Sequence, residues 1–137
     1  MNEAPRPVPL PDAEDREYWE AARRHELRMQ RCQSCGRFRF TPRPMCPFCQ
    51  SWEAEWAPVS GRGQVYSWVV VHPPVLPYFQ DKTPYAVALI QLEEGVRIVA
   101  NVIDVGKDEM AFDMPVEVIF EDVSEELTLP QFRRRRV

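Results

Sequence analysis

Cys32-Gln33-Ser34-Cys35-Gly36 and Cys46-Pro47-Phe48-Cys49 are the stretches that decide the fold, and ten residues separate Cys35 from Cys46. Two residues between the cysteines of each pair let both thiolates reach one ion while backbone amides of the turn point at the sulfurs. Gly36 offers the positive φ that such a turn needs. Four thiolates at about 2.3 Å satisfy zinc and leave no open position. The spacing therefore predicts one structural zinc, ligated by Cys32, Cys35, Cys46 and Cys49.

Three other uses of these cysteines compete with zinc. They could form two disulfides or a redox Cys-x-x-Cys pair, or they could hold iron in a rubredoxin-like site. Residues 1–11 lack the basic and then apolar layout of a signal peptide, and no apolar run of about 18 residues exists to span a membrane. We therefore expect a cytoplasmic protein without a membrane partner, in which thiols stay reduced and zinc is favoured.

The segment before the cysteines combines an extended arm with a helix. Residues 1–11 hold four prolines and show no periodicity. Asp12 is a candidate N-cap, with Asp15 as its capping partner, and apolar residues then recur at helical spacing. This pattern predicts a helix over about 13–25, and a short strand from Leu27 leads into Cys32.

After Gly61 the apolar period changes to two, which indicates strands. We expect a Glu94-Gly95 turn and five strands, over 64–72, 85–92, 96–103, 116–123 and 127–132. Five antiparallel strands in some 70 residues favour an OB-fold barrel, with a sandwich as the alternative. The predicted fold is thus mainly β: arm and helix (1–26), zinc ribbon (27–60), five-stranded OB-fold barrel (61–132) and basic tail (133–137).

We interpret most of the aromatic residues near the cysteines, and both histidines, as structural. We expect Phe38, Phe40, Phe48, Trp52 and Trp56 to form a small core around the cysteines. His25 is interpreted as a helix-surface residue and His72 as a strand-end residue, and neither sits in an evident catalytic set. Residues 73–84 form a long proline-rich loop, which we expect to be exposed at the edge of a ligand or partner surface, with Tyr78 and Phe79 as anchors.

Charge is distributed in blocks along the chain. Residues 27–52 hold five arginines and no acid, whereas residues 61–132 hold four basic residues against twelve acidic ones. An acidic barrel repels a phosphate backbone, so we expect no nucleic-acid partner. The alternative, a single-stranded nucleic-acid-binding OB-fold module, depends on the basic ribbon and the four terminal arginines. A stand-alone enzyme is a third hypothesis, for which no catalytic residue can be named.

The order of helix, four-cysteine ribbon and barrel resembles the DUF35 family, a rubredoxin-like zinc ribbon fused to an OB-fold and associated with acyl-CoA. The resemblance covers nearly the whole chain. It is carried by these stretches: Tyr18-Trp19-Glu20-Ala21-Ala22, Gln30-Arg31-Cys32-x-x-Cys35-Gly36, Pro44-x-Cys46-x-x-Cys49, Gly61-x-Gly63-x-Val65-Tyr66-Ser67, Pro84-Tyr85-x-Val87-Ala88-x-Ile90-x-Leu92-x-x-Gly95 and Pro130-x-Phe132.

The resemblance implies a partner and a role. Family members are small subunits that pair with thiolase-like proteins, in thiolase or synthase complexes or in retro-aldolases that shorten steroid side chains held as CoA thioesters. It implies a hetero-oligomer, two plus two, in which the partner holds the catalytic groups. The run from Arg133 to Arg136 departs from the family pattern.

Acyl-CoA, if this chain contacts it, would need cations for its phosphates and apolar walls for its pantetheine arm. The candidate ligand or partner residues are Arg37, Arg39, Arg43, His72, Tyr78 and Phe79. Equally, the arginines could serve only to balance the charge of the zinc thiolates or to form salt bridges with a partner.

Overall fold

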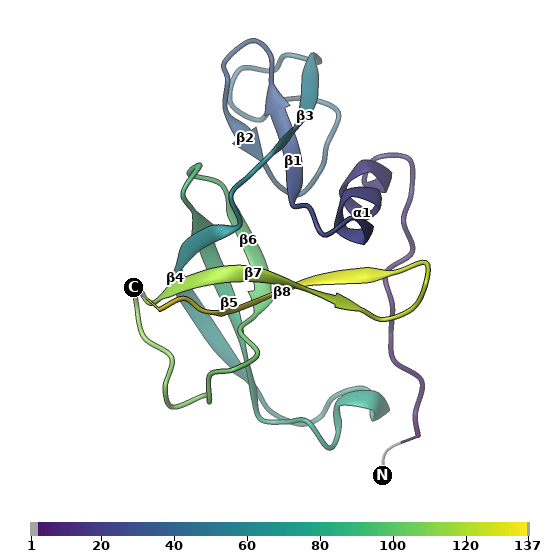
Figure 1. Cartoon of the computed structure of the whole chain (residues 1–137), viewed down its shortest axis with the longest axis vertical. Coiled ribbons are helices and arrows are strands. Elements are labelled where there is room, and N and C mark those ends of the chain that lie inside the picture. Colours follow the sequence, from purple (N-terminus) through teal and green to yellow (C-terminus); the bar gives the residue numbers. More distant parts are fainter. Residues whose placement is uncertain (1–2, 137) are drawn as a thin grey trace.

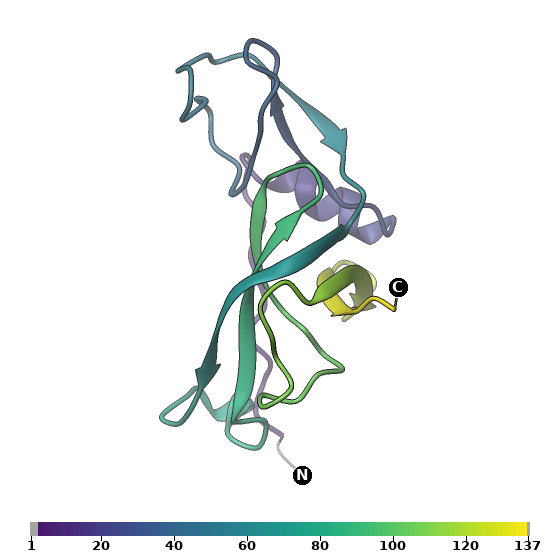
Figure 2. The ribbon, with the colours of Figure 1, turned by 90° about the vertical axis from the view of Figure 1, so that its left-hand side faces the viewer.

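The computed structural model describes residues 3–136, and the chain forms a small ribbon above a larger barrel (Figure 1). The turned view places the ribbon at one end, the barrel at the other and the helix between them (Figure 2). The elements are α1 (Arg16–Arg23), β1 (Arg28–Cys32), β2 (Phe38–Arg39), β3 (Ala54–Pro58), β4 (Arg62–Val71), the short 3-10 helix η1 (Pro77–Phe79), β5 (Tyr85–Leu92), β6 (Arg97–Asn101), β7 (Pro115–Asp122) and β8 (Thr128–Arg134).

The helix is shorter than the pattern predicts, because residues 13–15 form a turn before it. Asp12 and Asp15 do interact as a reciprocal pair. The Asp12 carboxylate accepts the backbone N–H groups of Glu14 and Asp15, and the Asp15 carboxylate accepts that of Asp12 at 2.8 Å. These bonds close the turn before the helix. The N-cap residue is Asp15, which makes no side-chain capping bond, so the prediction of Asp12 as the N-cap was wrong.

The ribbon is a three-stranded antiparallel sheet in the order β2-β1-β3. β1 is its centre: Arg31 lies opposite Phe38 on β2, and Cys32 lies opposite Ala54 on β3. The side chain of Met29 on β1 is fully buried. The central strand therefore connects the cysteine turns to the interior of the molecule.

The barrel is a five-stranded antiparallel sheet in the order β6-β5-β4-β7-β8. It closes where Val102, just after β6, bridges Phe132 on β8, and the Ile103 N–H donates to the Phe132 carbonyl at 2.9 Å. Phe132 is the largest fully buried side chain, at this closing point. The predicted five-stranded barrel is confirmed. β8 runs to Arg134, so two of the four terminal arginines are strand residues.

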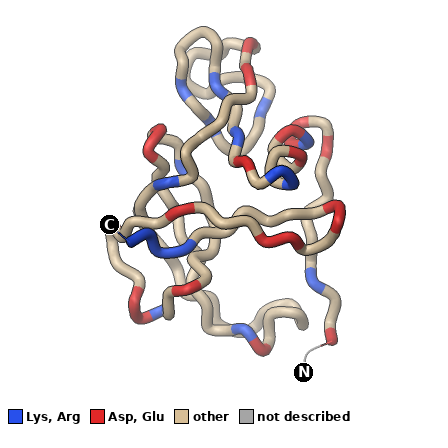
Figure 3. Tube along the Cα trace, viewed as in Figure 1, with Lys and Arg blue, Asp and Glu red and all other residues tan. Residues whose placement is uncertain are grey.

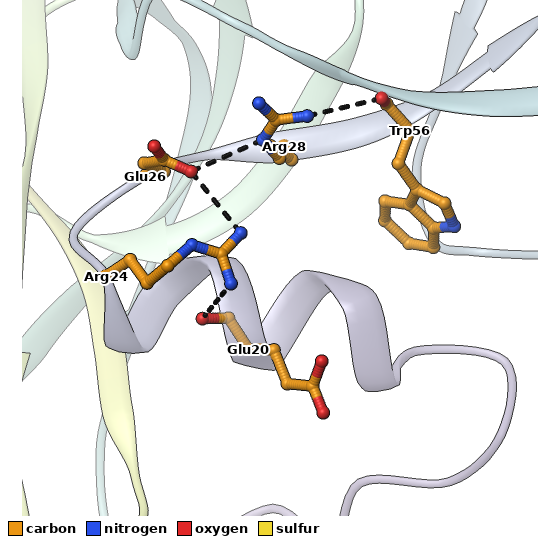
Figure 4. A network of polar contacts seen from close by, with 5 residues as sticks. All are labelled: Glu20, Arg24, Glu26, Arg28 and Trp56. Atoms are coloured by element: carbon orange, nitrogen blue, oxygen red, sulfur yellow. Dashed lines mark hydrogen bonds and ion pairs between the residues drawn. The ribbon is translucent and has the colours of Figure 1, made fainter.

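One hydrophobic core joins the helix, the ribbon and the barrel. Tyr18 on α1, Leu27 and Met29 belong to the same buried cluster as Ile90 and Phe132 of the barrel. The polar contacts between the helix end and the ribbon are long: Arg24 and Arg28 each reach Glu26 at 3.3–3.4 Å, and Arg28 reaches the Trp56 carbonyl at 3.4 Å (Figure 4). Exposed ion pairs of this kind contribute little, so apolar packing contributes most where the helix meets the ribbon.

The expected aromatic core around the cysteines is only partly present. Phe38, Phe40 and Trp56 pack against the main core, but Phe48 is 53% exposed and Trp52 is 70% exposed. The prediction was wrong for these two residues. Phe48 lies inside the second cysteine turn and Trp52 just after it, where the cysteine cluster, rather than buried apolar area, holds the chain together.

Among the described residues, no helix has the length and apolar character needed to cross a bilayer.

Candidate metal centre and neighbouring surfaces

The four cysteines converge on one point at the tip of the ribbon. Their sulfur atoms all lie within 4.8 Å of one another. Cys32 and Cys49 sulfurs are 3.6 Å apart, and Cys35 and Cys46 sulfurs are 3.7 Å apart. A tetrahedron of zinc–sulfur bonds of about 2.3 Å has edges of about 3.8 Å, whereas a disulfide needs about 2.05 Å. The donor set therefore fits a closed tetrathiolate zinc site.

Two similar turns supply the ligands. In the first, the Cys35 amide donates to the Cys32 sulfur at 3.4 Å, and Gly36 has φ of 77°. In the second, the Phe48 amide donates to the Cys46 sulfur at 3.4 Å, and Gln50 has φ of 63°. The predicted positive φ at Gly36 is confirmed, and a non-glycine residue takes that conformation in the second turn.

The thiols of this cluster differ in acidity. The backbone amide of Cys35 lowers the pKa of Cys32 to about 6. For Cys49, the Ser51 amide lowers the pKa, but the neighbouring cysteines, led by Cys32, together with burial outweigh it and raise the pKa to about 11. Because zinc binds thiolates, metal binding releases the protons that these cysteines still hold.

The ribbon arginines are not gathered at one place. Arg39 is only 4% exposed: it donates to the Gln30 side-chain oxygen at 3.0 Å and to the Arg43 carbonyl at 2.9 Å. Arg37 is exposed and lies 4.6 Å from the centre of the Phe48 ring, beside a hollow of about 530 Å³. The Arg43 side chain is exposed as well. Arg37 and Arg43 face solvent, whereas Arg39 supports the loop that leads to the second cysteine pair.

The proline-rich loop lines a cavity of about 450 Å³ at the far end of the barrel. Tyr78 and Phe79 are half-buried and meet edge to face at 5.0 Å, so the expectation of an exposed pair was wrong. The Tyr78 ring also lies 4.0 Å from the Lys82 ammonium and 5.6 Å from the Arg6 guanidinium. The arm, the loop and the barrel therefore meet around this cavity.

The two histidines lie far from the cysteines and in different surroundings. His72 is exposed and makes no hydrogen bond within residues 3–136. His25 follows the end of α1 with φ of 61°, so its prediction as a helix-surface residue was wrong. Its Nε2 lies 2.9 Å from the Asp122 carboxylate, and its ring stacks on Phe120 at 5.1 Å. His25 therefore links the helix end to the barrel.

Comparison with known proteins identifies the family. The rubredoxin-like zinc ribbon domain of ChsH2 matches residues 19–53, and the C-terminal OB-fold domain of ChsH2 matches residues 56–121. A solved structure titled Ltp2-ChsH2(DUF35) aldolase contains a chain 38% identical to this one, with a TM-score of 0.82 over 93% of this chain and 98% of that one. The chain belongs to the DUF35 family.

Some relatives match this DUF35 chain over only part of their own length. A probable enoyl-CoA hydratase alpha subunit of Thermomonospora curvata is 40% identical over 93% of this chain, which spans 40% of that protein's length. A benzoylsuccinyl-CoA thiolase subunit, BbsA of Thauera aromatica, is 36% identical over 55% of this chain and 50% of its own length. The DUF35 chain is thus homologous to subunits of hydratase, aldolase and thiolase enzymes, and its ribbon is consistent with one structural zinc.

Two long-range contacts of this DUF35 chain could not be predicted from the sequence. The Asp122 carboxylate accepts from Thr128 at 2.7 Å as well as meeting His25, and the Thr128 and His25 contacts hold the pKa of Asp122 below its usual value. Arg6 on the arm donates twice to Glu121, at 2.7 and 3.2 Å. No local pattern signals either pair, because the partners are separated by 97 and 115 residues.

Proposed function

We propose that this chain is a non-catalytic subunit that pairs with a thiolase-like protein in acyl-CoA metabolism. The complex would be a retro-aldolase that shortens a steroid or similar side chain held as a CoA thioester. In a retro-aldol step the bond between the α and β carbons breaks, the β-hydroxyl becomes a carbonyl and the α carbon takes up a proton, so no redox cofactor is needed. The proposal includes a two-plus-two assembly in the cytoplasm and the zinc ligands Cys32, Cys35, Cys46 and Cys49.

One observation carries the proposal. The likeness to the solved DUF35 chain of an aldolase complex extends over 93% of this chain and 98% of the other, at 38% identity. A match of both the ribbon and the barrel, in the same relative arrangement, supports a shared function more strongly than a match of the OB-fold alone would.

The chemistry of the described residues supports a division of labour with the partner. A zinc closed by four thiolates has no position for a water or a carbonyl, so it does not act as a Lewis acid. His25 is held by Asp122 at a structural junction. His72 has no orienting group within residues 3–136. Proton transfer at the substrate is therefore assigned to the thiolase-like protein.

Contact with acyl-CoA would involve either the exposed ribbon arginines or the loop cavity, because the ribbon and the loop lie at opposite ends of the molecule (Figure 2). Arg37 and Arg43 are free to meet phosphates, and neither makes an ion pair within residues 3–136. Phe79 gives the 450 Å³ cavity an apolar wall that would suit a pantetheine arm. Tyr78 and His72 complete the candidate contacts, whereas buried Arg39 is left to a structural role.

The proposal is tested by reconstitution with a thiolase-like protein from the same organism. We expect the two proteins to co-purify at a mass of two plus two, and retro-aldol activity to rise with added chain and to saturate at one chain per partner subunit. Cys46→Ser, which removes a zinc ligand, should abolish the activation. A partner that is soluble and fully active without this chain would contradict the proposal.

A further inference from the structure

One face of the barrel is apolar on the side turned to solvent. Along β4, β5 and β6, the buried interior side is formed by residues such as Val65, Ala88, Ile90 and Ile98. On the opposite side, the strand register places Val69 beside Val87 and Leu89 beside Val99. Val69 is 62% exposed, Val99 is 64% exposed and Tyr66 is 48% exposed. We call Tyr66, Val69, Val87, Leu89, Arg97 and Val99 the β4–β6 face.

A bulge in β4 builds this face. The pairing of β4 with β5 shifts register between Val65 and Ser67, so the intervening Tyr66 has no partner. Tyr66 and Ser67 are consequently both exposed, Trp68 turns inward onto Phe112 at 4.8 Å, and Val69 turns outward. Bulges redirect side chains in this way and recur near binding surfaces. A regular strand would have exposed Trp68 and buried Val69.

The β4–β6 face carries positive charge and no negative charge. β4, β5 and β6 contain no aspartate or glutamate, whereas the β7–β8 hairpin carries a cluster of acidic residues (Figure 3). The Arg97 guanidinium lies 3.8 Å from the centre of the Tyr66 ring and 3.3 Å from the Gln91 side-chain oxygen. It makes no ion pair within residues 3–136. The centre of a protein interface is typically rich in apolar residues, tyrosine and arginine and poor in acidic residues, and the β4–β6 face has this composition.

We propose that the β4–β6 face is where the thiolase-like partner docks, presenting apolar side chains and a carboxylate opposite Arg97; this rests on the proposed function. A second copy of the chain fits this face less well. Pairing the face with itself would bury two Arg97 side chains and offer no carboxylate to either, and an unpaired buried charge is costly. The partner is therefore a different surface, with an acidic residue set among apolar ones.

The test measures the dissociation constant of the full-length chain with the thiolase-like protein. Val69→Thr combined with Val99→Thr keeps side-chain shape and branching at Cβ, so the strands persist. We expect this variant to bind at least tenfold more weakly. Arg97→Glu should have a similar effect, and should reduce the dependence of the association rate on salt. The matched control, Val8→Thr with Leu10→Thr on the arm, should bind within twofold of wild type.

The outcomes separate this proposal from the one on which it rests. Each variant must hold one zinc and keep the wild-type melting temperature. If wild type fails to bind the partner, the proposed function falls. If wild type binds and both face variants bind within twofold of it, the docking face is wrong while the proposed function stands. If the wild-type chain dimerises alone and the face variants lose only that dimerisation, the face is a self-contact, which also overturns the proposal.

Discussion

The ribbon and the barrel are held in shape by different means. In the barrel, aliphatic and aromatic side chains gather around Phe132 and leave little polar surface inside. In the ribbon, two of the buried residues are Gln30 and Arg39, and four sulfurs converge at the tip. The comparison teaches that local order in the ribbon depends on a metal and on hydrogen bonds, whereas the barrel depends on apolar burial. Cys46→Ser, Phe132→Ala and Arg39→Met each remove one of these sources of stability.

The largest effect is expected from Cys46→Ser. Folding and metal binding are one event in a structural zinc site, and the apparent binding free energy in zinc-finger peptides is about 10–16 kcal/mol. Metal analysis should give one zinc per purified wild-type chain and almost none in the variant. Proteolysis should cut the variant within 33–53 and spare the barrel.

Ser34→Ala in the first cysteine turn is the matched control, since the Ser34 side chain bonds to Ser51 at 2.9 Å and its loss should leave the zinc in place. A metal-free wild-type chain that is fully folded with two disulfides would refute this account of the ribbon.

Phe132→Ala tests the barrel in the same way. Removing the ring leaves a cavity where the barrel closes, and such changes cost about 3–5 kcal/mol of unfolding free energy. Urea denaturation should show this loss while the zinc content of the native variant stays at one per chain.

Leu10→Ala, at an arm residue that is 88% exposed, should change the unfolding free energy by less than about 0.5 kcal/mol. If Phe132→Ala released zinc as readily as Cys46→Ser does, the two regions would not be stabilised independently.

Arg39→Met examines the polar interior of the ribbon. The change leaves the Gln30 oxygen and the Arg43 carbonyl each short of one donor. The Gln30 oxygen keeps the Arg43 amide as a donor at 2.8 Å, so each lost bond costs what an ordinary hydrogen bond contributes, about 0.5–1.5 kcal/mol. We expect faster zinc transfer to a chelator, followed by absorbance of the chelator complex.

Arg43→Met is the control, because the backbone of Arg43 rather than its exposed side chain makes the bonds to Gln30 and Arg39. Equal transfer rates in the two variants would show that the Arg39 bonds do not support the metal loop.

The smallest effect is the pH dependence of the Arg6–Glu121 contact between arm and barrel. Hydrogen bonding from Arg6 holds the pKa of Glu121 below its ordinary 4.5. A carboxylate whose pKa is lower in the folded state stabilises the fold above about pH 4.5, and this stabilisation fades as pH falls through the folded pKa. Because the pair is partly exposed, it contributes at most about 1 kcal/mol.

Thermal melts between pH 3 and pH 6 should therefore show a slightly smaller acid loss in Glu121→Gln than in wild type. Glu125→Gln, at an exposed residue with no ion pair in the described part of the chain, should follow wild type. An unchanged acid loss in Glu121→Gln would mean that the contact does not form in solution.

Sequence reasoning succeeded where the cause of a structure is local. The cysteine turns depend on two-residue spacings. The prediction of β5 before the Glu94-Gly95 turn has the observed bounds, and in the structure every second residue from Ala86 to Leu92 is buried. The barrel followed from the same period of two. These features need no knowledge of distant residues.

The rest of the fold depends on contacts between distant segments. His25 meets Asp122 across 97 residues, and Arg6 meets Glu121 across 115. The β4 bulge reverses the alternation after Tyr66, so the sequence alone does not tell that Val69 faces outward. Phe48 and Trp52 were placed in a core because of their type, although the cysteine cluster removes the need for one.

The most direct test of the central claim is turnover by the isolated chain. The zinc-loaded protein, the thiolase-like partner and their mixture would each be incubated with a β-hydroxyacyl-CoA, and the two products measured: the carbonyl compound formed at the β carbon and the short acyl-CoA that keeps the α carbon. We predict no product from the chain alone and rapid product from the mixture. Cleavage by the isolated chain that disappears in His72→Ala would contradict the account and make this protein an enzyme in its own right.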